Sequence, residues 1–217
     1  IAIIALLASA RFFLALAGLD VGTAFGGIGS SREVMIASLA EPAMLLIVFT
    51  MALVAHSTQL SAVAEVLSTS AVGLRVSLGM ALLGLIIVAI AENGRIPVDN
   101  PATHLELTMV HEAMVLEYSG RHLAMIELAA AMKLLLYVSL IGCIFLPWTL
   151  ATPDSSAVFH LAGFGFYLTK LAVLGFVLAV FETAIAKMRV FRLPDFVGGA
   201  LMLGLLGTLL LFVSRSL

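Results

Sequence analysis

The sequence predicts an all-α, polytopic membrane protein, and three observations support this fold class. Hydrophobic residues make up 62% of the 217 residues and charged residues only 11%, whereas soluble domains carry about 25% charged residues. Several apolar stretches approach the roughly twenty residues that a helix needs to cross a bilayer. These stretches are continuously apolar, which does not fit the alternating strands of a transmembrane β-barrel.

Six membrane-crossing helices are expected from these stretches, within one transmembrane domain over residues 1–217. They lie at about 1–17, 34–56, 72–91, 122–147, 158–186 and 195–214. In the first, we expect Arg11 to snorkel toward the membrane interface. The chain opens at Ile1 inside an apolar run, without Met or a basic signal region, so we expect that an N-terminal part is missing.

The second and last helices carry features that modify a plain apolar span. A glycine-rich stretch, "GTAFGGIGSSRE", precedes the second helix, and we expect a turn there with Ser30 or Ser31 as the helix cap. Pro42 lies within this helix and predicts a kink. In the last helix, Ala200 and Gly204 are spaced for close helix packing. The alternative is that these small residues have no packing role.

Lysine and arginine are divided unevenly between the two sides of the predicted bundle. The loops at about 18–33, 92–121 and 187–194 share one side and carry the larger set, namely Arg32, Arg95, Arg121, Lys187, Arg189 and Arg192. The opposite side carries Arg75 and Arg215. The positive-inside rule therefore predicts that the first set is cytoplasmic and that the C-terminus lies on the outer side.

Five ionisable residues lie deep enough within the spans to need an explanation: Glu41, Glu127, Lys133, Lys170 and Glu182. Each costs about 2.5–3.5 kcal/mol at a helix centre and usually marks a pathway or an internal ion pair. Snorkelling is an alternative for Glu127 and Glu182. Lys133 and Lys170 lie farther from the predicted ends, which favours a functional role.

The segment between the third and fourth spans, residues 92–121, is unusually rich in ionisable groups. It contains five of the 13 acidic residues and two of the five histidines, namely Glu92, Asp99, Glu106, Glu112, Glu117, His104 and His111. Asn100 and Pro101 favour a helix start, and nothing breaks a helix from there to Tyr118. Glu106 and Glu117 would then share one face and the two histidines the opposite one.

Apolar residues fill the angles between these groups, so the predicted helix has no clean solvent-facing stripe. We expect a short helix enclosed on all sides, with its ionisable side chains pointing into internal polar spaces. Burial disfavours the charged forms of such groups, so the charge of one neighbour decides whether another holds a proton. The alternative is a solvated cytoplasmic loop whose charges have no role.

Several other classes of site are excluded. A net charge of −2 provides no basic surface for nucleic acid. The lone Cys143 can neither form an internal disulfide nor ligate an iron–sulfur cluster, so we expect cofactors only in other chains. "HEAMV" lacks the second zinc-binding histidine because Val115 occupies that position, and the glycine-rich stretch matches neither the P-loop nor GxGxxG.

The run "AENGRIPVDNPATHLELTMVHEAMVLEYSGRHLA", with "GLDVGTAFGGIGSSREVMIASLAEPA" and "RVFRLPDFVGG", resembles a known family over nearly the whole chain. It resembles the membrane subunit of group 4 NiFe hydrogenases, the hydrogenase-4 component C or formate hydrogenlyase subunit 4 type. More distantly, it resembles the quinone-chamber subunit of complex I, NADH dehydrogenase subunit 1. The relatives' loop motif A-E-T-N-R-x-P-F-D, E-L and E-Y is matched at Ala91, Glu92, Arg95, Pro97, Asp99, Glu106, Leu107, Glu117 and Tyr118.

The resemblance implies a subunit with eight membrane helices, six of them present here, in the cytoplasmic membrane of a prokaryote. It implies a soluble arm, with a NiFe large subunit and an iron–sulfur small subunit, and antiporter-like membrane subunits as partners. Glu92, Asp99, Glu106, Glu117 and Glu41 would line a proton path, and Arg95 would hold the loop by pairing. The longer Glu106–Glu117 interval and His104 in place of an acid resemble the hydrogenase branch and argue against a bound quinone.

Four functions are compatible with these residues. The first is a subunit that couples electron transfer in the arm to proton or Na⁺ movement through the listed acids, histidines and lysines. The second is a purely structural anchor, in which Arg32, Arg95 and Arg121 serve docking. The third is a quinone site, and the fourth a stand-alone transporter, which would show internal repeats that we do not find.

Overall fold

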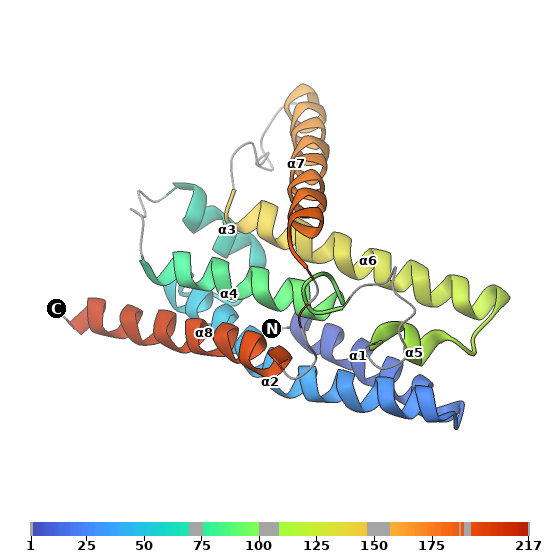
Figure 1. Ribbon diagram of the computed structural model, residues 1–217. Coiled ribbons are helices and arrows are strands. Elements are labelled where there is room, and N and C mark those ends of the chain that lie inside the picture. The colour runs from blue at the N-terminus through green and yellow to red at the C-terminus, as the bar shows by residue number, and fades with distance from the viewer. Residues whose placement is uncertain are drawn as a thin grey trace.

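The computed structural model describes residues 2–69, 76–99, 109–146, 157–186, 188 and 192–216. Within these ranges all regular structure is helical, which confirms the predicted fold class. The helices, in chain order, are α1 (Ala2–Asp20), α2 (Ala24–Ala55), α3 (Leu60–Thr69), α4 (Val76–Glu92), α5 (His111–Val115), α6 (Gly120–Ile144), α7 (Ala157–Ala184) and α8 (Leu193–Ser216). Figure 1 shows their arrangement.

Among the described residues, five helices are long and apolar enough to cross a membrane, and a sixth apolar helix is shorter. The five are α1, α2, α6, α7 and α8, and the shorter helix is α4, with 17 residues. They correspond to the six predicted spans, although residues 72–75 of the third lie outside the described ranges. Helix α3 is not among the predicted spans.

The start of α2 differs from the prediction. The helix begins at Ala24, and Thr23 is its cap, accepting the Gly26 N–H at 3.2 Å. Ser30 and Ser31 are therefore inside the helix and cap nothing. The glycine-rich stretch was expected to be a turn because glycine usually breaks helices, but here packing against neighbouring helices stabilises the helical form. The helix continues through Pro42, whose ring is exposed.

The predicted helix from Pro101 to Tyr118 is wrong over its described part, because helix α5 spans only His111–Val115. The Asp99 carboxylate accepts the N–H groups of Val110 and His111, at 3.2 and 3.3 Å. A continuous helix would direct those N–H groups to the preceding turn instead. Residues 100–108, with Asn100, His104 and Glu106, lie outside the described ranges.

Helices α2, α4 and α8 pack against one another (Figure 1). Small residues permit the close approach, as predicted for the last helix: Ala200 is fully buried, and a Cβ on Gly204 would lie 3.2 Å from Leu46 of α2. The Thr50 and Thr208 hydroxyls form a buried 2.8 Å hydrogen bond between α2 and α8. Small residues at these positions therefore serve packing.

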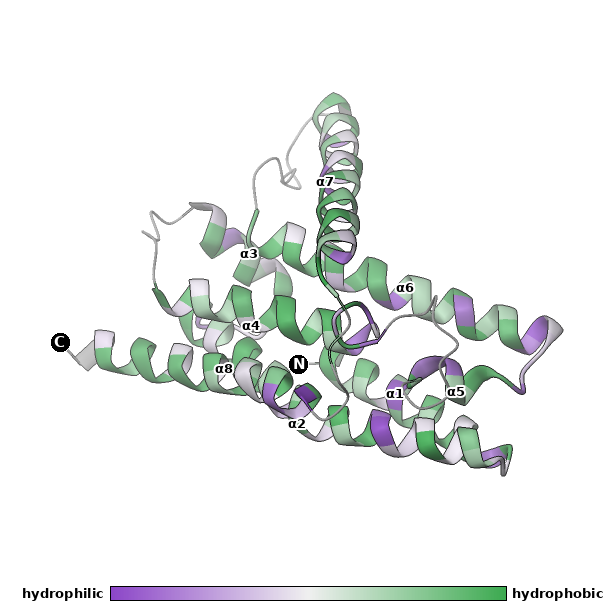
Figure 2. Ribbon diagram, in the orientation of Figure 1, coloured by the Kyte–Doolittle hydropathy of each residue, from purple (hydrophilic) through white to green (hydrophobic). Residues whose placement is uncertain are grey.

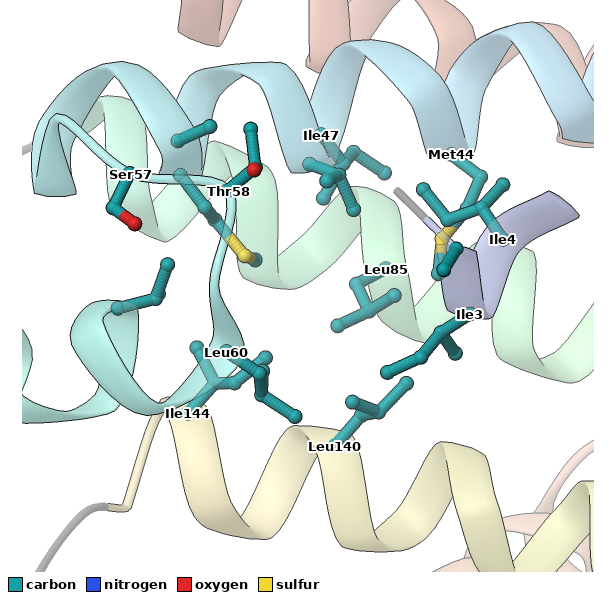
Figure 3. Close-up of a pocket in the computed structure, with 15 residues that line it drawn as sticks. Ile3, Ile4, Met44, Ile47, Ser57, Thr58, Leu60, Leu85, Leu140 and Ile144 are labelled. Atoms are coloured by element: carbon teal, nitrogen blue, oxygen red, sulfur yellow. The ribbon is translucent and has the colours of Figure 1, made fainter.

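Toward the N-terminal end of α1, an apolar pocket of about 210 Å³ lies between α1, α2, α3, α4 and α6. Figure 3 shows Met44, Ile47, Leu85 and Leu140 around it, with the Ser57 and Thr58 hydroxyls at one end. Its lining residues include no ionisable side chain. The charged groups lie farther along α1, toward its C-terminal end.

Helix α7 is placed differently from the rest. In Figure 1 it runs across the direction of the other long helices and extends beyond them. Its polar contacts include two with α6 and the residues after it: the Tyr167 and Ser139 hydroxyls lie 2.7 Å apart, and Lys170 Nζ donates to the Leu146 carbonyl at 2.6 Å. Most of its apolar surface is exposed in this chain.

Candidate functional site

The polar residues gather at one end of the bundle, around α5 and the turn that follows α4 (Figure 2). After Glu92 the chain reverses at Gly94, which has a φ of +55° that other residues rarely adopt. The Arg95 N–H donates to the Ile90 carbonyl at 3.0 Å, and the Val98 N–H donates to the Arg95 carbonyl at 2.8 Å. This turn brings Asp99 back beneath α5, where it is 3% exposed.

Helix α5 is held against α1 and α2 by glycines and by two side-chain hydrogen bonds. A Cβ on Gly29 would lie 2.9 Å from both the Val110 carbonyl and Met114, closer than such atoms can approach. Arg32 Nη1 donates to the Met109 carbonyl at 2.7 Å, and the Tyr118 hydroxyl donates to Ala17 at 3.0 Å. The glycine-rich stretch therefore forms the surface on which the charged segment docks.

Four charged residues meet beneath this segment, each from a different helix. Arg11 of α1 pairs through Nε with Glu33 of α2 at 2.8 Å and through Nη1 with Glu92 of α4 at 2.7 Å. Lys133 of α6 donates from Nζ to the Glu92 carbonyl oxygen. We call Arg11, Glu33, Glu92 and Lys133 the charge cluster.

The charge cluster is formally neutral, and three of its residues are buried while Lys133 is half-buried. Arg11 is 3% exposed, and Glu33 and Glu92 are each 7% exposed. A buried ion costs several kcal/mol unless opposite charges and hydrogen bonds compensate for its lost hydration. Two cations opposite two carboxylates compensate the charge, although Arg11 Nη1 and Nη2 lack hydrogen-bond partners among the described residues. The pairing makes each group dependent on the protonation of the others.

A cavity of about 240 Å³ adjoins the charge cluster. Its ionisable lining residues come from α2, from the turn after α4, from α5 and from α6: Glu33, Glu92, Arg95, Asp99, His111, Glu112, Glu127 and Lys133. A water molecule occupies about 30 Å³ of liquid, so a cavity of this size can hold several waters. It extends from the exposed Glu127 to the buried Glu92.

Burial lowers the pKa of His111 below its ordinary value, and the nearby Lys133 ammonium lowers that pKa further. The carboxylates of Glu33, Glu112 and Asp99 act in the opposite direction but do not outweigh these two causes. His111 is therefore a neutral imidazole at neutral pH and can both donate and accept a proton in the cavity.

The predicted site residues divide into those that the structure brings together and those that it does not. Glu92, Asp99, His111, Glu112 and Lys133 meet at the cavity, and Glu41, half-buried on α2, interacts electrostatically with Glu92. Outside this site, Lys170 lies on α7 and Glu182 pairs with Arg95 at 3.6 Å. Glu117 and Arg121 are exposed in this chain, contrary to the expectation that Glu117 is enclosed.

Sequence reasoning missed Arg11 and Glu33. The prediction that Arg11 snorkels is wrong, because its side chain points inward to two carboxylates. One signal was available: Arg11 is the lone charged residue of the apolar run at 1–17, and such a residue usually faces an internal partner. Glu33 lies at the end of the glycine-rich stretch, which was expected to form a turn before the helix. Tyr137, which is 2% exposed beside Arg11 and Glu92, was also missed.

No group of three or more His, Cys, Asp or Glu side chains suited to a metal ion lies within the described part of the chain. The site instead alternates acids and bases of opposite charge. Such an arrangement suits proton transfer, since neighbouring groups stabilise one another's charged forms.

Comparison with known proteins adds to this geometry. Residues 1–213 match the family described as NADH dehydrogenase. Formate hydrogenlyase subunit 4 of Escherichia coli (strain K12) is 32% identical over 189 residues, which cover 87% of this chain and 60% of that protein. Hydrogenase-4 component C of the same strain is 34% identical over 191 residues, covering 87% and 58%. The chain thus spans about three fifths of the length of these relatives.

Proposed function

The chain belongs to the NADH dehydrogenase family, and from that premise we propose that it couples electron transfer to proton or Na⁺ movement in a hydrogenase-4 or formate hydrogenlyase type complex. A soluble arm carrying a NiFe large subunit and an iron–sulfur small subunit would dock over the charged segment. The resulting change in protonation would pass to antiporter-like membrane subunits. All redox centres would lie in the arm, and this chain would hold no cofactor of its own.

The charge cluster beneath a polar cavity carries this proposal. A unit charge that appears on the arm about 10 Å from the cluster changes the energy of a buried charge by about 1.7 kcal/mol at an effective dielectric constant of 20. That energy corresponds to just over one pKa unit. The redox state of the arm can therefore decide whether the cluster and the cavity bind or release a proton.

Within the cluster the residues have different roles. Arg11 stays protonated, since a guanidinium does not lose its proton in proteins, and it orients Glu33 and Glu92. Lys133 and Glu92 are the groups that exchange a proton. Glu127 and Glu112, on the cavity wall, relay protons toward them through bridging waters, with His111 as a neutral intermediate.

From the cluster, the path would continue through Glu41 and through Lys170 on α7 toward the antiporter-like subunits. Glu106, Glu117 and His104 would supply protons from the side of the arm. Asp99, through its hydrogen bonds from the Val110 and His111 N–H groups at the start of α5, would fix the segment, as would Arg32 through Met109 and Arg95 through Glu182. The exposed Arg121 would contact the arm. We place this segment in the cytoplasm and the C-terminus on the outer side.

A purely structural anchor is the second candidate, and the exposed Arg121 in the first turn of α6 supports it. The anchor predicts that surface arginines matter for assembly, whereas the charge cluster matters only for stability. The quinone alternative predicts that quinone-site inhibitors block the complex.

The discriminating experiment replaces Lys133 with Met in the complex in its native membrane. We measure hydrogen evolution and proton movement together in sealed vesicles. Coupling predicts that hydrogen evolution persists while the protons moved per hydrogen fall at least about tenfold, since a proton-transfer group contributes about 10²–10⁴-fold to the rate of the step it serves. A Lys133→Met complex that assembles and moves protons at the normal ratio would leave only the anchor.

A further inference from the structure

A second cavity is lined in part by Tyr137, the buried residue beside Arg11 and Glu92 of the charge cluster. It is a groove of about 300 Å³ between α4, α6 and α7, and its wall is almost wholly apolar, with Arg95 and Tyr137 among its lining residues. The apolar lining residues are Ile86, Ala89, Ile90, Leu134, Val138, Ile141, Leu174, Val177, Leu178 and Phe181. The groove is thus bounded by three apolar helices and has a cationic side chain in its wall.

The course of the three helices shows that Arg95 lies at one end of the groove. Residues 86–90 of α4 lead toward Arg95, whereas residues 134–141 of α6 and 181–174 of α7 lead away from the turn that contains it. Seven residues of helix measure about 10 Å. The groove therefore runs from Arg95, at the polar end of the bundle, about 10 Å into the apolar layer.

The mouth of the groove favours an anion. Arg95 pairs with Glu182 at 3.6 Å, a loose contact between side chains that are 33% and 22% exposed. The backbone N–H of Met188 donates to the Pro97 carbonyl at 2.8 Å, which ties the link between α7 and α8 to the turn that carries Arg95. Met188 lies between Lys187 and Arg189 in the sequence, and Arg192 is exposed.

We propose that this groove binds one acyl chain of an anionic phospholipid whose headgroup phosphate pairs with Arg95. The apolar wall alone cannot select a ligand, since bulk lipid tails are as apolar as the groove. Selectivity therefore comes from the headgroup, and a juxtamembrane cation favours an anionic lipid about fivefold. The bound lipid fills the space that separates α7 from α4 and α6.

The test uses the complex purified from native membranes in mild detergent, with retained lipids extracted and quantified by mass spectrometry. The wild type should keep an anionic phospholipid, phosphatidylglycerol or cardiolipin, at a higher ratio to phosphatidylethanolamine than the bulk membrane has. Arg95→Gln should lower that ratio about fivefold. Glu182→Gln removes the competing carboxylate and should raise it, an effect that general damage to the fold would not produce.

Two valines on α7 provide a matched pair for the tail. Val177 lines the groove and Val173 does not, yet both are 55% exposed. Val177→Trp should fill the groove and remove one retained phospholipid per complex, whereas Val173→Trp should leave retention unchanged. Equal retention in the two tryptophan variants, or recovery of a quinone in place of the phospholipid, would overturn the proposal.

Discussion

Helices α2 and α7 are alike in sequence character and opposite in structure. They have 32 and 28 residues, and their most apolar stretches have the same mean hydropathy of 2.0. Yet 39% of that stretch is buried within the chain in α2 and none of it in α7. Hydropathy therefore predicts that a helix enters the membrane but not whether the protein or something else surrounds it.

Small residues and polar partners account for the difference. A Cβ on Gly26 or Gly29 of α2 would collide with α1 or α5, whereas one on Gly165 or Gly175 of α7 would meet nothing within 4 Å. Between helices in lipid, association depends on such close contacts and on hydrogen bonds, because burial of apolar surface provides no drive there. The α2 face carries the buried Glu33, which pairs with Arg11 at 2.8 Å, whereas Glu182 of α7 makes a looser and more exposed pair with Arg95 at 3.6 Å.

The largest loss of stability is expected when the cation that α2 shares with its neighbours is removed. Arg11→Met leaves Glu33 and Glu92 buried beside each other without their common partner, and breaking such a pair costs about 3–5 kcal/mol. Thermal inactivation of the purified complex should show the loss. Adding Glu33→Gln to this variant should restore part of the stability. A single variant as stable as the wild type would mean that the cluster is hydrated.

A smaller loss of stability is expected from replacing a glycine of α2, and a glycine of α7 provides the comparison. Gly29→Leu overfills the contact between α2 and α5 and should destabilise the protein by about 1–3 kcal/mol. Gly175→Leu on α7 should change stability by less than about 0.5 kcal/mol, as do most substitutions on open surfaces. The ratio of folded to aggregated protein after graded heating measures both. Equal losses would show that α7 is packed as tightly as α2.

The pH dependence of stability should test whether His111 is buried in the cavity that α2 helps to line. Since the pKa of His111 is lowered in the folded protein, the unfolded chain binds a proton there more readily. The stability contributed by neutral His111 is present above its ordinary pKa of about 6.5 and is lost as the pH falls through the lowered one. His111→Gln should weaken the acid-side loss in melting temperature against pH. Identical curves would contradict the burial of this imidazole.

The smallest effect concerns the ion pair at the end of α7. Glu182→Gln weakens a half-exposed contact of 3.6 Å with Arg95 and should cost no more than about 1 kcal/mol. The melting temperature of the complex at low and at high salt measures it. A loss comparable to that of Arg11→Met would mean that α7 is held by this pair.

The sequence was sufficient to predict the membrane class and the approximate positions of the helices, because long apolar runs have few alternatives. Glu92, Asp99 and Lys133 were also predicted, since a charge in an apolar surrounding is conspicuous. Arg11 and Glu33 were not, because pairing between residues 22 positions apart depends on how α1 and α2 cross. The N-terminal extent of α2 was not predicted either, because its glycine-rich stretch is stabilised as helix by packing against neighbouring helices.

The central claim is tested most directly by the number of protons moved per hydrogen evolved in the Glu92→Gln variant. The control is the Glu65→Gln variant, which changes an exposed residue of α3. Both changes remove one carboxylate charge, but only Glu92 belongs to the buried cluster. Coupling through the cluster predicts that the Glu92 variant still evolves hydrogen while its proton ratio collapses, and that the control keeps the normal ratio. An assembled Glu92→Gln complex with the same ratio as the Glu65 control would contradict the account.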